Sequence, residues 1–192
     1  MTPNSRAPLA LRLDAVETPL GDLLVAADAD GILRAADFAD CEVRLASLLD
    51  RRLGKAAWSL SPGIAPAGIR LALSAYFAGD LAALRAIPVR TDGTPFQDAM
   101  WAMLRDIAPG HPLAYSIVAQ RLGRPAAARA VGHANGANPF CIIIPCHRLV
   151  GANGALTGYS GGLERKRWLI AHERRHAAAA TDDPAGEIRP AR

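Results

Sequence analysis

Residues 138–148 read Asn-Pro-Phe-Cys-Ile-Ile-Ile-Pro-Cys-His-Arg. The apolar run at residues 140–144 has the length of a buried strand, and Pro145 ends it. Because proline removes a backbone donor and fixes φ, we expect the chain to leave the core at Cys146. The charge of Arg148 favours the thiolate form of that cysteine. The stretch therefore predicts a buried strand that ends in a nucleophilic thiol.

Other interpretations of this cysteine are open at the level of the sequence. A cysteine beside a histidine is often a core thiol next to a surface imidazole. Zinc binding by Cys141, Cys146 and His147 is disfavoured, because their spacing and the core position expected for Cys141 do not give a closed four-ligand site. We expect no metal.

A carboxylate lies on the apolar side of the last predicted helix, residues 163–176. Glu173 stands three and four residues beyond Ile170 and Leu169, which places it on their face of the helix. One interpretation is an ordinary salt bridge, with Arg174 or Lys166. The other is that Glu173 orients His147 as an acid–base relay for Cys146, and spacing alone does not choose between them.

Two short helices precede the cysteine. An amphipathic helix over residues 115–122 is followed by a Gly-Arg turn and by a second helix over residues 125–136, which is a helix-turn-helix outline. The second helix is rich in alanine, so its backbone can approach a surface closely, and Arg129 and His133 share one of its faces. A helix of small residues that carries one long cation suits a DNA groove.

The first part of the chain indicates a small sheet with helices. Alternating or apolar runs at residues 11–15, 23–27 and 32–38 are separated by turns, and helices are expected at residues 41–53 and 66–77. Thr94-Pro95-Phe96-Gln97 is a capping box that opens a helix ending before Pro109. We therefore place a domain boundary near residues 90–93.

Composition fits a soluble DNA-binding protein of a reducing compartment. The chain has 192 residues, 51% of them hydrophobic, and no stretch with the length of a membrane span or the pattern of a secretory signal. Its three cysteines form neither an even set nor a CxxC pair, which favours the cytoplasm. Residues 93–175 hold 10 basic and 4 acidic side chains, an excess of +6, against 10 and 11 in residues 1–92. The positive charge is concentrated where the helix-turn-helix is predicted.

An ordered set of motifs resembles one family. Ile144-Pro145-Cys146-His147-Arg148 followed by Gly158-Tyr159-Ser160-Gly161-Gly162 is similar to the active-site stretch of the O6-alkylguanine-DNA alkyltransferases. The similarity extends over about residues 94–173. It includes Thr94-Pro95-Phe96-Gln97, Trp101, Tyr115, Ala128-Arg129-Ala130-Val131-Gly132, Asn138-Pro139 and Ala171-His172-Glu173. Residues 76–79, Tyr-Phe-Ala-Gly, resemble the family more loosely, as do the hairpins.

The resemblance implies a role for each matched residue. Cys146 is the alkyl acceptor, His147 its base through a water, and Glu173 the group that holds His147. Tyr115 assists the leaving guanine and crowds the phosphate, so that the nucleotide rotates out of the helix. Arg129 fills the gap in the base stack, on a helix that enters the minor groove through Ala128, Ala130 and Gly132. The base pocket is formed by Asn138, which braces the active-site turn, by Tyr159 and Ser160, and by Arg148.

We therefore expect an α/β (α+β) protein. An RNase H-like sheet domain occupies residues 1–92, a mostly helical DNA-binding and alkyl-acceptor domain occupies residues 93–176, and a disordered tail follows at residues 177–192. The expected reaction moves an alkyl group from O6 of guanine, and from O4 of thymine, in double-stranded DNA to Cys146, once per molecule. The expected protein is a cytoplasmic monomer with no cofactor and no membrane contact.

Three rival functions stay open. A non-catalytic alkyl-lesion binder resembles this family but lacks the acceptor cysteine. A thiol hydrolase built on Cys146, His147 and Glu173 turns over and needs no groove helix. A methylation-responsive transcription regulator carries an extra zinc-binding cysteine module, which this sequence lacks.

Overall fold

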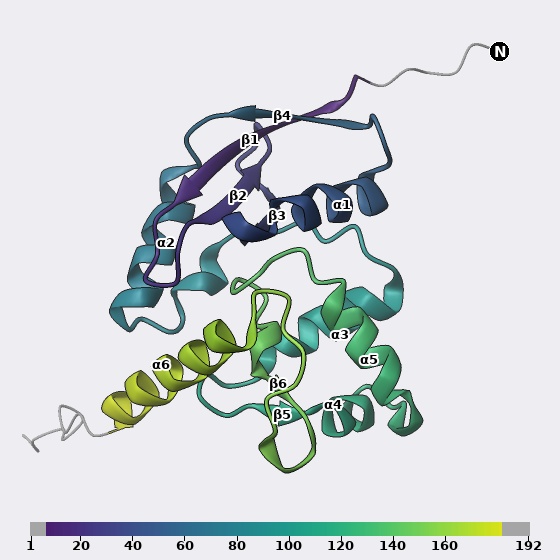
Figure 1. The fold of residues 1–192 in the computed structure, drawn as a ribbon, viewed down its shortest axis with the longest axis vertical. Coiled ribbons are helices and arrows are strands. Elements are labelled where there is room, and N and C mark those ends of the chain that lie inside the picture. The colour runs from purple at the N-terminus through teal and green to yellow at the C-terminus, as the bar shows by residue number, and fades with distance from the viewer. Residues whose placement is uncertain (1–6, 182–192) are drawn as a thin grey trace, which may run out of the picture.

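A computed structural model describes residues 7–181 and contains one four-stranded sheet (Figure 1). The strands are β1 (Leu9–Val16), β2 (Leu23–Ala27), β3 (Leu33–Phe38) and β4 (Trp58–Pro62), in the order β3-β2-β1-β4. The first three pair antiparallel, as the predicted hairpins require, and β4 runs parallel to β1. We did not predict β4, because its short Trp-Ser-Leu-Ser-Pro run is largely exposed and ends in a proline.

The two faces of the sheet are covered differently. Helix α1 (Glu42–Leu53) packs on one face, where Leu45 and Leu49 form a small cluster with Leu11 of β1. Helix α2 (Ala67–Ala78) and the C-terminal part of the chain contribute to the larger apolar cluster, which also takes in Val25 of β2. This larger cluster contains buried residues from both sides of the predicted domain boundary, so the two parts share a core.

The C-terminal part is mostly helical (Figure 1). Helix α3 (Pro95–Asp106) starts at the predicted capping box: Thr94 Oγ1 accepts from the backbone of Gln97, whose side chain accepts from the backbone of Thr94. The remaining α-helices and strands are β5 (Leu113–Ala114), α4 (Tyr115–Arg121), α5 (Ala128–Gly136), β6 (Leu149–Val150) and α6 (Leu163–Thr181). Short 3-10 turns are η1 (Ala39–Cys41), η2 (Ala83–Ala86), η3 (Pro125–Ala127), η4 (Cys146–Arg148) and η5 (Ala152–Gly154).

The predicted strand at residues 140–144 is wrong. Phe140 makes a single parallel bridge to Ala36 of β3, and the chain then turns, with the amide of Ile144 donating to the carbonyl of Phe140 over 2.9 Å. Ile142 has φ of 69°, in the left-handed region that a β-branched residue rarely adopts. The apolar run reflects burial on all sides between the sheet and the helices, and burial does not by itself distinguish a turn from a strand.

The last helix is longer than predicted. We placed its end at residue 176 and expected a disordered tail from residue 177, but α6 continues to Thr181. Residues 177–180 are alanines, which have the highest helix propensity, and the helix extends through them. The rest of the predicted tail, residues 182–192, lies outside the described residues. Among the helices of residues 7–181, none is both long and apolar enough to cross a membrane.

Candidate active site

The turn that carries Cys146 is held by one asparagine. The side-chain amide of Asn138 donates to the carbonyl of Ile144 over 2.8 Å and to that of Phe140 over 3.5 Å, while its oxygen accepts from the amide of Phe140 over 3.0 Å. Asn138 is 1% exposed. Because the amide side chain links both ends of the turn, it fixes the position of Cys146 at the start of η4.

Behind Cys146, one buried carboxylate gathers four groups. Glu173 of α6 contacts His147 Nε2 through Oε1 at 2.8 Å, and it accepts from the Arg148 guanidinium at 2.8–3.1 Å. Its Oε1 also accepts from the hydroxyl of Tyr76 at 3.0 Å, and its Oε2 accepts from the amide of Gly110 at 3.1 Å. Of the two interpretations left open by the spacing, the structure shows the pairing with His147.

The pKa of Glu173 lies far below its ordinary value. Burial alone raises this pKa, but the charge and hydrogen bond of His147 and the hydrogen bonds of Arg148 lower it by more. The ionised carboxylate can only accept, so His147 Nε2 must carry a proton and donate it. In a neutral ring this leaves Nδ1 as the basic atom. His147 Nδ1 is buried and has no hydrogen-bond partner within the described part of the chain.

Cys146 is only 2% exposed, and its pKa is lowered. The main cause is a hydrogen bond from Cys141, which together with Asn138 and the charge of Arg44 outweighs the effect of burial. Arg148, the source predicted from the sequence, is not among these causes: its guanidinium is bound to Glu173 and to the carbonyl of Ile107, 2.6 Å away. Arg148 therefore supports the carboxylate.

The parallel pairing of β5 and β6 places Tyr115 beside this site. Leu113 pairs with Leu149 and Ala114 with Val150, so Tyr115, the first residue of α4, lies alongside the chain that leaves η4. Burial raises the pKa of Tyr115, and the negative charge of Cys146 adds to the rise. The phenol therefore stays protonated and able to donate near the thiol.

A surface hollow of about 670 Å³ starts at Tyr115. Arg51 of α1 and Tyr115 line it together with residues of α5 and the residue after that helix: Ala128, Arg129, Gly132, His133, Gly136 and Ala137. The side chain of Arg129 is exposed, and so is that of Ala130 on the same helix. Helices α4 and α5 are joined by a turn and pack together.

Tyr159 and Ser160 lie on the loop before α6. The Tyr159 hydroxyl is 3.0 Å from Cys141 Sγ, and its ring stands edge-on to that of His147, with centroids 6.5 Å apart. Ser160 is exposed, and its carbonyl lies 3.5 Å from the thiol of Cys41. The loop thus contacts the cysteine turn through Tyr159.

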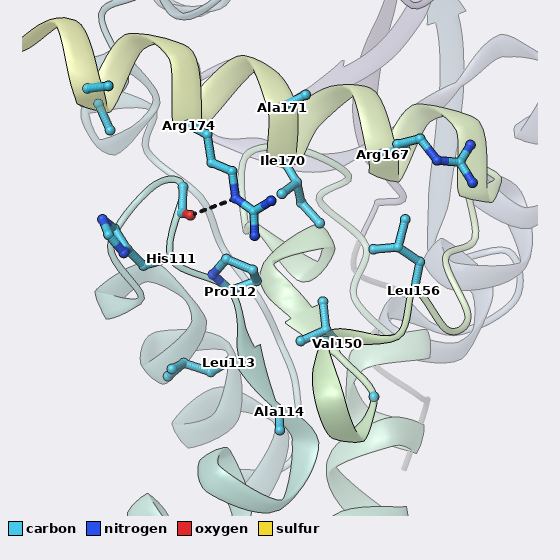
Figure 2. A pocket seen from close by; sticks show the side chains of 15 residues that line it. His111, Pro112, Leu113, Ala114, Val150, Leu156, Arg167, Ile170, Ala171 and Arg174 are labelled. Carbon is cyan, nitrogen blue, oxygen red and sulfur yellow. Dashed lines mark hydrogen bonds between the residues drawn. The ribbon is translucent and has the colours of Figure 1, made fainter.

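A larger hollow, of about 1270 Å³, lies between α6 and the segments 110–114 and 150–156 (Figure 2). Figure 2 shows Arg174 reaching from α6 to the carbonyl of Gly110, 3.3 Å away, above the segment 111–114. The residues that line it do not include Cys146, His147 or Glu173. This hollow therefore lies outside the cluster of reactive groups. No group of three or more histidine, cysteine or acidic residues within residues 7–181 is arranged to hold a metal ion.

Comparison with known proteins identifies the family. The profile described as "6-O-methylguanine DNA methyltransferase, DNA binding domain" matches residues 95–175. The methylated-DNA–protein-cysteine methyltransferase of Shigella flexneri is 44% identical over 165 residues, which cover 86% of this chain and 96% of that protein. The chain belongs to the methylated-DNA–protein-cysteine methyltransferase family.

Solved structures of this methyltransferase family share the fold. The crystal structure of Mycobacterium tuberculosis OGT in complex with DNA superposes with a TM-score of 0.69 at 35% identity, covering 88% of this chain and 94% of that one. The O6-methylguanine-DNA methyltransferase from Pyrococcus kodakaraensis has the same fold at a TM-score of 0.64 and 24% identity. The predicted family and the mixed α/β fold class are therefore confirmed.

Sequence reasoning named Lys166 only as a possible salt-bridge partner of Glu173, and it gave neither Lys166 nor Tyr76 a place in this methyltransferase site. Lys166 is fully buried and donates to the carbonyls of Thr157 and Gly158 at 2.6 and 3.4 Å, and burial lowers its pKa to about 8. It stands seven residues before Glu173, on the same face of α6, so the spacing argument used for Glu173 could have found it. Tyr76 had no comparable signal, because its contact with Glu173 joins residues 97 positions apart.

Proposed function

We propose that this protein repairs double-stranded DNA by moving an alkyl group from O6 of guanine, or from O4 of thymine, to the sulfur of Cys146. Membership of the methyltransferase family supports alkyl transfer to a cysteine. The observation that carries the choice of cysteine is the placement of Cys146 on a clamped turn, directly before the His147–Glu173 pair. Neither Cys41 nor Cys141 is followed by a histidine in this way.

The DNA contact in this proposal is the face of α5. An alkylated base inside a duplex is out of reach of a buried thiol, so the nucleotide has to rotate out of the stack. The small residues Ala128, Ala130 and Gly132 let the helix backbone approach the minor groove closely. Arg129, exposed on that face, fills the gap left by the base, and Tyr115 crowds the neighbouring phosphate.

Proton transfers accompany the chemical step. The thiol proton of Cys146 passes through a water to His147 Nδ1, the basic atom left free by the bond to Glu173. The sulfur then attacks the alkyl carbon, the carbon–oxygen bond breaks, and the guanine anion is neutralised by a proton donated from Tyr115 toward N3. The product is a thioether. A thioether sulfur is a poor leaving group, so each molecule reacts once.

The remaining features of the proposal follow the same chemistry. Tyr159 and Ser160 form the wall of the base pocket, on the loop that Lys166 anchors. The reaction needs no dissociable cofactor, because nucleophile, base and acid are all side chains. We propose that the protein works as a cytoplasmic monomer that binds DNA and no membrane.

The test is the intact mass of the protein after mixing with duplex DNA that carries O6-methylguanine. We expect the mass of one methyl group to be added to Cys146, and Cys146→Ser to bind the duplex without reacting, since a serine hydroxyl is a poor nucleophile at neutral pH. Cys41→Ser is the matched control and should react. DNA binding without any mass change in the wild type would favour a lesion binder, and a methylated variant lacking Cys146 would refute the assignment.

A further inference from the structure

The loop before α6, residues 157–162, is held by an arginine that the proposed reaction does not use. Arg165, the third residue of α6, donates from Nη1 to the carbonyl of Gly161 over 3.1 Å. The same nitrogen lies 2.9 and 3.0 Å from the two carboxylate oxygens of Asp40, and Nε donates to the carbonyl of Leu20 over 3.0 Å. Asp40 lies in η1 and Leu20 between β1 and β2, so one guanidinium joins the loop to two segments of the N-terminal part.

Phe38, the last residue of β3, completes this contact. The guanidinium of Arg165 lies over its ring, with Cζ 4.0 Å from the ring centroid, which is within the range of a cation–π interaction. The same ring lies against Gly161: a Cβ added there would stand 3.0 Å from two ring carbons of Phe38 and 2.8 Å from Cε1 of Tyr159. The loop backbone is therefore in close contact with both rings, and a side chain at Gly161 would displace one of them.

Two consecutive residues of α6 thus anchor the two ends of the loop. Lys166 donates to its first two carbonyls, and Arg165 donates to that of Gly161. Tyr159 lies between these anchors, with its ring edge-on to that of His147. The loop is therefore fixed relative to the reactive groups, and one of its two anchors extends to the N-terminal part of the chain.

We propose that Arg165 is a positioning residue that holds the wall of the base pocket, and that it thereby makes the acceptor favour small alkyl groups. The inference rests on the proposed function in one respect, namely that Tyr159 and Ser160 form this wall. A wall that is held in place is preorganised for the transfer of a methyl group. A larger group such as benzyl requires the wall to move, so its transfer gains less from the anchor and loses less when the anchor is removed.

The experiment measures single-turnover alkyl transfer from two duplexes, one with O6-methylguanine and one with O6-benzylguanine, over a series of protein concentrations. In Arg165→Ala we expect the saturating rate of methyl transfer to fall about tenfold, the effect of losing one hydrogen bond to a charged group. Benzyl transfer should fall less, so the ratio of the benzyl rate to the methyl rate should rise. The protein concentration at half saturation should stay near that of the wild type, because the DNA face of α5 is unchanged.

Further variants keep the inference testable if Arg165→Ala does not fold. Arg165→Lys keeps the charge but cannot reach all three partners at once, so the ratio should still rise. Asp40→Ala removes one partner and should raise the ratio less, and adding it to Arg165→Ala should have no further effect. Arg167→Ala is the matched control, since this exposed arginine of the same helix pairs with Glu164 and should leave the ratio unchanged.

Amide hydrogen exchange monitors the anchor without any reaction. Peptides that cover residues 157–162 should exchange faster in Arg165→Ala than in the wild type or in Arg167→Ala. Unchanged exchange would show that Arg165 does not hold the loop, and an unchanged ratio of rates would show that it does not set the pocket; either result overturns the inference. A wild type that transfers neither alkyl group refutes the proposed function and the alkyl preference with it, while the exchange data still decide whether Arg165 anchors the loop.

Discussion

Replacing Tyr76 by phenylalanine removes one donor from the carboxylate that holds His147. Tyr76 is fully buried on α2, and its hydroxyl donates to Glu173 Oε1, the same oxygen that receives His147 Nε2. Hydrogen bonds to charged groups contribute about 1.5–3 kcal/mol. Since Glu173 keeps the donors of His147, Arg148 and Gly110, we expect the lower end, a loss of about 1.5 kcal/mol in the free energy of unfolding.

The same change should slow alkyl transfer. With one donor fewer, Glu173 Oε1 is held less firmly where it orients His147 Nε2. A cost of about 1.5 kcal/mol bounds the loss at about tenfold in the single-turnover rate.

The assay is single-turnover methyl transfer from duplex DNA, measured together with urea unfolding. Ile69→Val on the same helix is the matched control, because it trims a buried side chain that no hydrogen bond joins to Glu173. If Tyr76→Phe is destabilised while its rate coincides with that of Ile69→Val, Tyr76 only fills the core and the positioning argument fails.

Three other predictions concern the DNA face and the buried carboxylate. Arg129→Ala and Arg129→Lys should both repair duplex DNA more slowly than the wild type but react with free O6-benzylguanine at the wild-type rate, because only the duplex has a gap to be filled. If Arg129→Lys repairs the duplex at the wild-type rate, positive charge alone is sufficient. DNA affinity measured by fluorescence anisotropy should fall steeply with added salt, given the +6 excess in residues 93–175, and a flat profile would argue against phosphate contacts. The lowered pKa of Glu173 contributes stability that is complete above its ordinary value of 4.5 and is lost as the pH falls below it. The free energy of unfolding of Glu173→Gln, measured in urea, should therefore fall less steeply with acid than that of the wild type. An equal dependence on pH in the two proteins would contradict this.

The sequence was most informative where local chemistry sets the conformation. The capping box at Thr94 and Gln97 and the hairpin strands are present as predicted, because caps and turns depend on residues close in sequence. Helical spacing suggested that Glu173 faces the core and could pair with His147. It could not exclude an ordinary salt bridge with Arg174 or Lys166. The RNase H-like description and the DNA-binding use of α4 and α5 stay predictions.

The predictions that the structure contradicts, and the residues that were not predicted, share one physical origin: they depend on contacts between distant parts of the chain. The run at residues 140–144 is apolar because it is enclosed by the sheet and the helices, and a turn satisfies that burial as well as a strand does. Arg148 was expected to favour the thiolate because it lies near Cys146 in sequence, but its guanidinium pairs with the carboxylate of Glu173 on α6. Tyr76 and Arg44, which reach the site from the N-terminal part, follow no local pattern.

The bridge between Ala36 and Phe140 has a consequence for the newly made chain. Strand β3 is the last strand of its sheet. On its outer edge Leu33 is bridged to Val89, through bonds with Pro88 and Arg90, and Ala36 is bonded to the cysteine turn. An uncovered strand edge is a template for pairing with other molecules. Until residues 139–141 have left the ribosome, the amide and carbonyl of Ala36 have no partner, and the N-terminal part is open to self-association. The segment that carries the reactive thiol therefore also closes the sheet against aggregation.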